Sequence, residues 1–152
     1  MTVREQVAAA GARVRSKRGS VLMTILSVLL PWRAWFMRAA WTTLGRTIYA
    51  PTWIDVAGSL EPYRSILEHE LVHVRQWRRW WLVYPISYLL LPLPIGLAWW
   101  RWRWEREAYL VQLRAGTSVE HVVDTLWRHY GWPWPRWAMR RWFRRALARG
   151  PS

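Results

Sequence analysis

Residues 80–100 form a stretch of 21 residues without a charge, and the way this stretch folds constrains the rest of the chain. Tryptophans close both of its ends and arginines lie immediately outside, so by length and flanks it resembles a transmembrane helix. However, Pro92 and Pro94 remove two amide donors and fix two φ angles, which breaks the stretch into two halves. Each half, at about a dozen residues, is too short to span a bilayer. We therefore expect an apolar helical hairpin, in the protein core or dipped into one leaflet, that returns the chain to its starting side.

The segment before this hairpin carries an H-E-x-x-H pattern made by His69, Glu70 and His73. Residues four apart share a helix face, so the two imidazoles can bind one Zn²⁺. A catalytic zinc keeps a water as its fourth ligand and lowers the pKa of that water to about 7. Glu70 is placed to take the proton when the water attacks a carbonyl. The alternative is a pair of surface histidines on a charged helix.

The pattern lies where a helix is expected. Pro62 suits a first helical turn, and Ser65 with Glu68 has the spacing of a capping box, so the helix should begin between Ser59 and Ser65. Apolar residues recur downstream at helical spacings. The motif therefore belongs to an amphipathic helix.

After the hairpin, a second predicted helix supplies two carboxylates, Glu105 and Glu107, in the run Trp104-Glu-Arg-Glu-Ala-Tyr109. Here the chain resembles the gluzincins, zinc peptidases in which a glutamate from a later helix completes the two histidines of H-E-x-x-H. The local E-x-E-A form is similar to the glutamate helix of the CAAX-prenyl endopeptidase family and of the minigluzincins. This resemblance implies one zinc per chain, held by the two histidines and Glu105.

Two further residues of this run could act at such a site. Where the resembling families have an aspartate that supports a histidine ligand, this chain has Tyr109, whose hydroxyl could form the supporting hydrogen bond. Glu107 is an alternative ligand or supporting residue. The competing interpretation is that both glutamates lie on a solvated helix face and pair with Arg103 and Arg106.

Upstream of the motif, the run Thr42 to Pro51 predicts one short strand at Thr47, Ile48 and Tyr49. In the gluzincins an edge strand ahead of the active-site helix pairs with extended substrate. The resemblance thus implies that these three residues form a substrate-binding strand. Backbone pairing of this kind gives affinity for peptides with little sequence preference.

Composition limits the partners and the kinds of site. The chain has 152 residues and no cysteine, which excludes a disulfide framework and a thiolate metal site. Its net charge is +14, and its 23 basic residues are arginines except for Lys17. This charge attracts anionic lipid, and the 16 tryptophans, many interleaved with arginine, favour a membrane boundary or fill the core. Nucleic-acid binding is the weakest interpretation, because no recognised module accompanies the charge.

The rest of the chain divides into a basic N-terminal segment and one domain. Residues 1–20 are polar and basic and are expected to be mobile. The apolar run Val21 to Leu30 has no clean cleavage site after it, so a membrane-lying or buried helix is favoured over a signal peptide. Helices are expected from Val119 towards Tyr130 and from Trp137 to Ala148, with a rigid turn between them.

The sequence thus predicts a mainly α-helical protein with a small β element, an α+β class, with one zincin-like domain over residues 21–150. Its expected function is that of a zinc-dependent metallopeptidase-like hydrolase acting on a peptide or protein. We expect a peripheral or monotopic protein on an anionic membrane surface, at the cytoplasmic side, with a soluble cytoplasmic protein as the alternative. The competing function is a non-catalytic membrane-associated protein with a structural metal site. Glu70 favours catalysis, because a structural site needs no carboxylate beside its open position.

Overall fold

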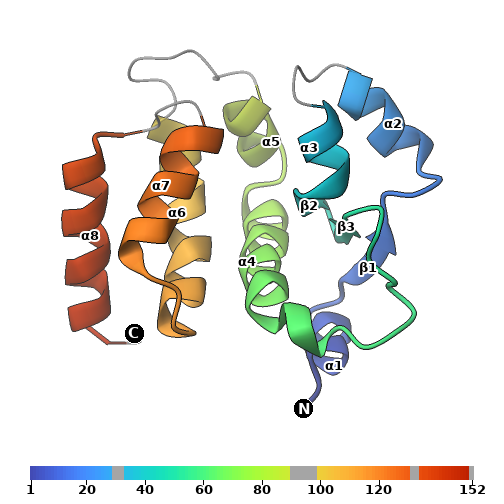
Figure 1. Ribbon diagram of the computed structural model, residues 1–152, viewed down its shortest axis with the longest axis horizontal. Helices are drawn as coiled ribbons and strands as arrows, with labels where there is room; N and C mark the ends of the chain where they lie inside the picture. Colours follow the sequence, from blue (N-terminus) through green and yellow to red (C-terminus); the bar gives the residue numbers. More distant parts are fainter. Residues whose placement is uncertain (29–32, 90–98, 131–133, 151–152) are drawn as a thin grey trace. The chain divides into compact units, whose positions relative to one another are not determined.

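The computed structural model describes residues 1–28, 33–89, 99–130 and 134–150. The protein is mainly helical with a small three-stranded sheet, which confirms the predicted α+β class (Figure 1). The chain divides into two compact units, Met1–Val74 and Arg75–Ser152, where one domain was expected from residue 21 onward. The division falls within the long helix α4 (Arg64–Trp80), whose last turns belong to the second unit.

The sheet of the first unit consists of β1 (Arg13–Ser16), β2 (Thr42–Leu44) and β3 (Thr47–Ala50) in the order β1-β3-β2. β3 pairs in parallel with β1 and antiparallel with β2. Gly45, in the turn between β2 and β3, has a φ of 60°, which glycine adopts without steric penalty. The predicted strand exists as β3, but it is the central strand and not an edge. Its backbone is paired on both sides, so the expectation of an edge strand at these residues is wrong, and their substrate-binding role stays a prediction.

The N-terminal segment that we expected to be mobile forms helix α1 (Val3–Ala9) and strand β1. Thr2 and Glu5 form a capping box at the start of α1. Val3 and Val7, four residues apart on one face, are buried in a hydrophobic cluster with Ile48 and Leu67. Burial of this apolar pair orders the segment, because it removes both valines from water.

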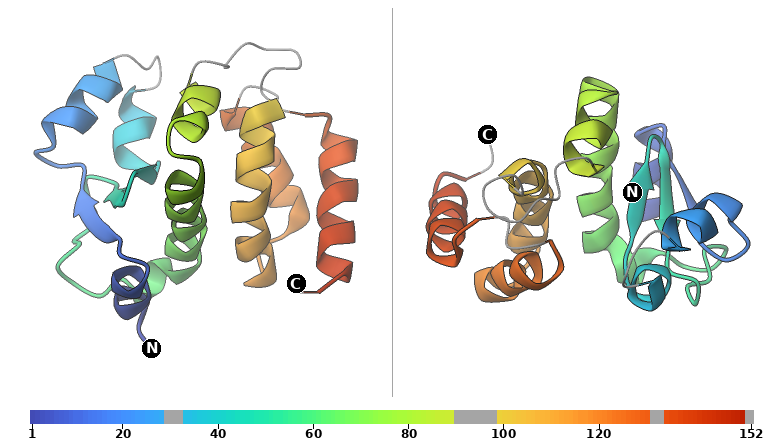
Figure 2. Two further views of the ribbon diagram at one scale, coloured as in Figure 1. Left: turned by 180° about the vertical axis from the view of Figure 1, so that it is seen from behind. Right: turned by 90° about the horizontal axis from the view of Figure 1, so that it is seen from above.

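Helices α2 (Val21–Val28) and α3 (Arg33–Arg38) pack against one another in the first unit (Figure 2). The predicted apolar helix from Val21 is thus present as α2, and its last two expected residues lie outside the described part of the chain. A 3-10 turn, η1 (Glu61–Tyr63), leads directly into α4. The helix therefore begins within the predicted interval, although Ser65 lies inside it and not at its cap.

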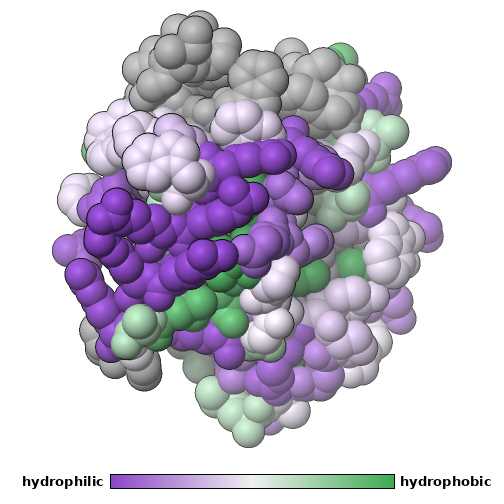
Figure 3. All heavy atoms as spheres, turned by 60° about the vertical axis from the view of Figure 1, so that its left-hand side comes forward, coloured by the Kyte–Doolittle hydropathy of each residue, from purple (hydrophilic) through white to green (hydrophobic). Residues whose placement is uncertain are grey.

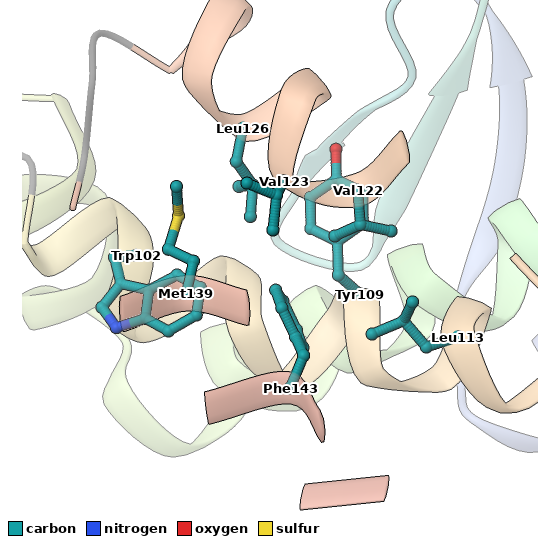
Figure 4. Packing of buried hydrophobic residues seen from close by; sticks show 8 residues of the cluster. All are labelled: Trp102, Tyr109, Leu113, Val122, Val123, Leu126, Met139 and Phe143. Carbon is teal, nitrogen blue, oxygen red and sulfur yellow. The ribbon is translucent and has the colours of Figure 1, made fainter. Parts of the chain in front are cut away.

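The second unit contains α5 (Val83–Leu89), α6 (Trp99–Arg114), α7 (Val119–His129) and α8 (Arg136–Ala148). Ser118 caps α7 by accepting a hydrogen bond from the backbone N–H of His121 at 3.2 Å. The core of this unit lies among α6, α7 and α8 (Figure 4). It contains the buried residues Trp102, Tyr109, Leu113, Val122, Val123, Leu126, Met139 and Phe143.

The expected apolar hairpin is described only in part. Its first half contains α5, whereas residues 90–98, with both prolines, lie outside the described residues. Among the helices that the structure does describe, none combines the length and the apolarity that crossing a membrane requires.

The tryptophans of this unit differ in burial. Trp102 fills the core and is 3% exposed, whereas Trp137 of α8 is 67% exposed. Hydrophilic side chains are prominent on the face seen with α8 turned forward (Figure 3). On α8, Arg144 forms an ion pair with Glu120 of α7 at 3.0 Å. This arginine therefore contacts a neighbouring helix of its own unit.

Candidate metal centre

Helix α4 presents His69 and His73 side by side. Their Nε2 atoms lie 3.2 Å apart, and both side chains are buried. Two nitrogens bound at about 2.05 Å to a tetrahedral zinc would be separated by roughly 3.3 Å. The histidine pair therefore already has the spacing of two ligands on one ion. The alternative of two solvated surface histidines is wrong.

The packing of the opposite side of α4 explains the direction in which His69 and His73 point. Leu67, Leu71 and Val74 pack into the hydrophobic cluster of the first unit. At 100° per residue these three lie within about 60° of one another, and both histidines lie more than about 100° from their centre. Packing of the apolar face thus fixes the rotation of the helix and directs the histidines to the other side.

Glu70, the second residue of the motif, is buried and is held by strand β2. The Oγ1 hydroxyl of Thr43 donates a hydrogen bond of 2.6 Å to Oε2 of Glu70. Hydrogen bonds to a charged carboxylate are among the stronger ones in proteins, so this contact restrains the orientation of the Glu70 carboxylate. Thr43 lies 27 residues before Glu70, and no local pattern in the sequence indicates the contact.

Lys17 places a buried amino group in the same unit. Its Nζ donates to the carbonyl oxygens of Phe36 at 2.6 Å and Ala40 at 2.8 Å, and it lies 3.8 Å from the centre of the Phe36 ring. Burial lowers the pKa of Lys17 from 10.5 to about 7, and the carboxylate of Glu70 opposes part of that lowering. The sequence showed Lys17 only as one charge in a basic segment.

In the second unit, the two acidic candidates of α6 differ in burial. Glu105 is 2% exposed, whereas Glu107 is exposed and lies 3.8 Å from Arg103 in an ion pair. Residues two apart point about 200° apart around a helix, so only one of them can face inward. The solvated-face interpretation thus fits Glu107 and fails for Glu105. The buried group His69, His73 and Glu105 could hold a metal ion.

Gln76, near the end of α4, contacts the chain immediately before Glu105. Its Nε2 donates to the carbonyl oxygen of Trp104 at 3.0 Å and to Oε2 of Glu107 at 3.3 Å. The carbonyl of Trp104 belongs to the peptide bond that joins it to Glu105. Gln76 is buried and was not among the residues predicted from the sequence.

Tyr109, the expected supporting residue, packs in the core of the second unit. Its hydroxyl lies 3.4 Å from that of Tyr130, and the two rings meet edge to face. A supporting role for Tyr109 beside a histidine ligand stays a prediction.

Of the residues predicted as a substrate-binding strand, Thr47 and Ile48 are buried. The neighbouring edge strand β2 carries Thr43, the residue that contacts Glu70. The likeness to the gluzincins rests on the two short segments that carry His69, Glu70, His73 and Glu105. In comparisons with known proteins, no family model matches the chain, and no curated protein or solved structure matches it.

Proposed function

We propose that this protein is a zinc-dependent hydrolase that cleaves peptide bonds, with His69, His73 and Glu105 as metal ligands and Glu70 as the general base. The observation that carries the proposal is the pair of histidine Nε2 atoms at 3.2 Å, with a buried glutamate between them on the same helix. Histidine nitrogens and a carboxylate oxygen are ligands that zinc accepts in catalytic sites.

Helix α4 supports Glu105 as the third ligand. α4 continues without a break from His73 to Gln76. Residues three apart share a helix face, so His73 points towards the same side as Gln76. Gln76 in turn donates to the peptide carbonyl that precedes Glu105. Glu105 carries the buried carboxylate on the turn of α6 that Gln76 contacts. We therefore assign it as the third ligand beside the two histidines.

A bound zinc would supply Lewis acidity and a water whose pKa lies near 7. With the ion bound, Glu70 would be the residue that accepts a proton from the attacking water. Glu70 would then donate this proton to the departing amine of the cleaved peptide. Thr43 holds Oε2 of Glu70, so that Oε1 is the oxygen that carries the proton. His69, His73 and Glu105 would hold the ion.

Glu70 also distinguishes this function from a structural metal site. A structural site is closed by its four ligands and gains nothing from a further buried carboxylate. Burying a carboxylate is unfavourable unless hydrogen bonds stabilise it, and Thr43 provides such a bond here. An acidic side chain kept in this position is best explained by proton transfer.

The test compares Glu70→Gln with Glu107→Gln, the same change at an exposed glutamate of α6. Each purified protein is loaded with zinc, its metal content is measured, and it is incubated with a degenerate fluorogenic peptide library. Glu70→Gln should keep its zinc and lose hydrolysis by at least about a hundredfold, because only the base is removed. Glu107→Gln should retain both properties.

Two results would contradict the proposal. If Glu70→Gln cleaves the library as fast as the wild type, Glu70 is not the base. If the wild type binds one zinc and cleaves no peptide at all, the structural metal site is the better account.

A further inference from the structure

Helix α2 exposes its apolar side to solvent. Val21, Leu22, Ile25 and Val28 are 73%, 48%, 56% and 64% exposed. At 100° per residue these four side chains fall within an arc of about 120°. The opposite side of α2 carries the buried Met23 and Ser27, which attach the helix to its unit. The exposed stripe is therefore fixed in place and continuous along the helix.

The stripe lies within a long basic segment. Between Glu5 and Asp55 the sequence contains no acidic residue. The side chains of Arg15 and Arg18 before α2 are exposed, and so are those of Arg33 and Arg38 after it. Large aliphatic side chains between exposed cations are what an interfacial helix presents to lipid, with arginines at the headgroups and the stripe in the acyl boundary.

We propose that α2 is a docking helix for an anionic membrane surface, with Val21, Leu22, Ile25 and Val28 inserted at the headgroup boundary. Charge favours this occupant over a second copy of the chain, because each copy carries a net charge of +14 and two copies repel one another. The proposal does not depend on the metal centre, which uses none of these residues.

The first experiment measures co-sedimentation of the full chain with vesicles of phosphatidylcholine alone or mixed with phosphatidylglycerol. The wild type should bind the anionic vesicles at least about tenfold more tightly than the neutral ones, and added salt should reduce the difference. The double variant Ile25→Ser/Val28→Ser should lose at least about tenfold in binding to the anionic vesicles. The matched variant Ile25→Leu/Val28→Leu keeps both positions apolar, with slightly more apolar area, and should bind at least as tightly as the wild type does.

A second experiment locates the contact. The chain has no cysteine, so one introduced at position 25 can carry a single environment-sensitive fluorophore. An Ile25→Cys label should enter an apolar environment when anionic vesicles are added. A label at Ala57→Cys, on an exposed loop residue of the same unit, should stay in water.

Three outcomes would overturn the proposal. The label at position 25 could stay in water while the protein binds vesicles, which would assign binding to arginines elsewhere, such as those of α8. The wild type could bind no vesicles at all. It could also form a dimer that the serine variant disperses, which would make a second copy the occupant. Glu70→Gln should bind vesicles unchanged, so failure of the membrane proposal is distinguishable from failure of the hydrolase.

Discussion

The hydroxyl group of Thr43 lies 2.6 Å from Oε2 of Glu70, and this hydrogen bond joins the edge strand β2 to the helix that carries both histidines. It fixes the direction of a buried carboxylate before any substrate arrives. A general base must be aligned within a few tenths of an ångström to act efficiently, and such alignment is provided by residues that contact it.

Replacement of Thr43 by valine should therefore slow catalysis without removing the metal. A hydrogen bond to a charged group contributes about 1.5–3 kcal/mol, which corresponds to a loss of roughly tenfold to a hundredfold in kcat/KM. Thr43→Ser keeps the hydroxyl and should restore most of the rate. Zinc content and the urea midpoint are measured for both variants. A serine variant as slow as the valine variant would show that the methyl group matters and the hydrogen bond does not.

The hydrogen bond from Gln76 of α4 to the carbonyl of Trp104 in α6 can be tested by mutation. Gln76→Leu removes the donor to the buried carbonyl of Trp104 and should lower the free energy of unfolding by about 1–3 kcal/mol. If Gln76 also orients the turn that carries Glu105, zinc affinity should fall by about tenfold or more. Arg75→Gln, at the exposed neighbouring position, is the control for both measurements. Unchanged zinc affinity in the leucine variant would show that Gln76 does not contribute to metal binding.

Lys17 should make the stability of the fold depend on pH. Burial lowers its pKa from 10.5 to about 7, so between these values the unfolded chain keeps a proton that the folded chain has lost. The unfolded state then binds more protons, and the free energy of unfolding rises with pH across this window. Below about pH 7 both states are protonated, and this contribution to the pH dependence ends.

The measurement is urea unfolding at about pH 6.5 and about pH 9.5. The wild type should gain more stability between the two values than Lys17→Met does, because methionine has no proton to lose. Arg18→Met, which removes a neighbouring exposed charge, should keep the wild-type gain. Equal gains in the wild type and in Lys17→Met would show that the lysine does not titrate in this range.

Local signals in the sequence were enough to predict α4, α6, α7 and α8. Ser118 as the cap of α7 and the apolar spacing along α4 are set by residues within a few positions of one another. Strand β1 could not be predicted in this way, because it pairs with β3 across about thirty residues, Arg13 opposite Thr47. That partner also converts β3 from the expected edge strand into the central one. Helix α1, at 7 residues, is too short to show the helical repeat of apolar residues.

The residues of the candidate site also differ in whether local sequence signals could predict them. The proximity of His69 and His73 follows from the helix repeat, because residues four apart share a face. Glu105 is buried and Glu107 is exposed, and their roles at a metal stay predictions. Thr43, Lys17 and Gln76 contact residues far along the chain or backbone carbonyls, which carry no side-chain signature. Contacts of this kind depend on tertiary packing, so only a structure could assign them.

The most direct test of the metal centre is zinc titration of the full chain with its four single variants. The wild type should bind about one zinc, and His69→Ala and His73→Ala should abolish tight binding, because each removes one of three protein ligands. Glu105→Ala should weaken binding by about a hundredfold or more, whereas Glu107→Ala should bind nearly as the wild type does. Equal zinc binding by all five proteins, or a larger loss in Glu107→Ala than in Glu105→Ala, would contradict the proposed ligand set.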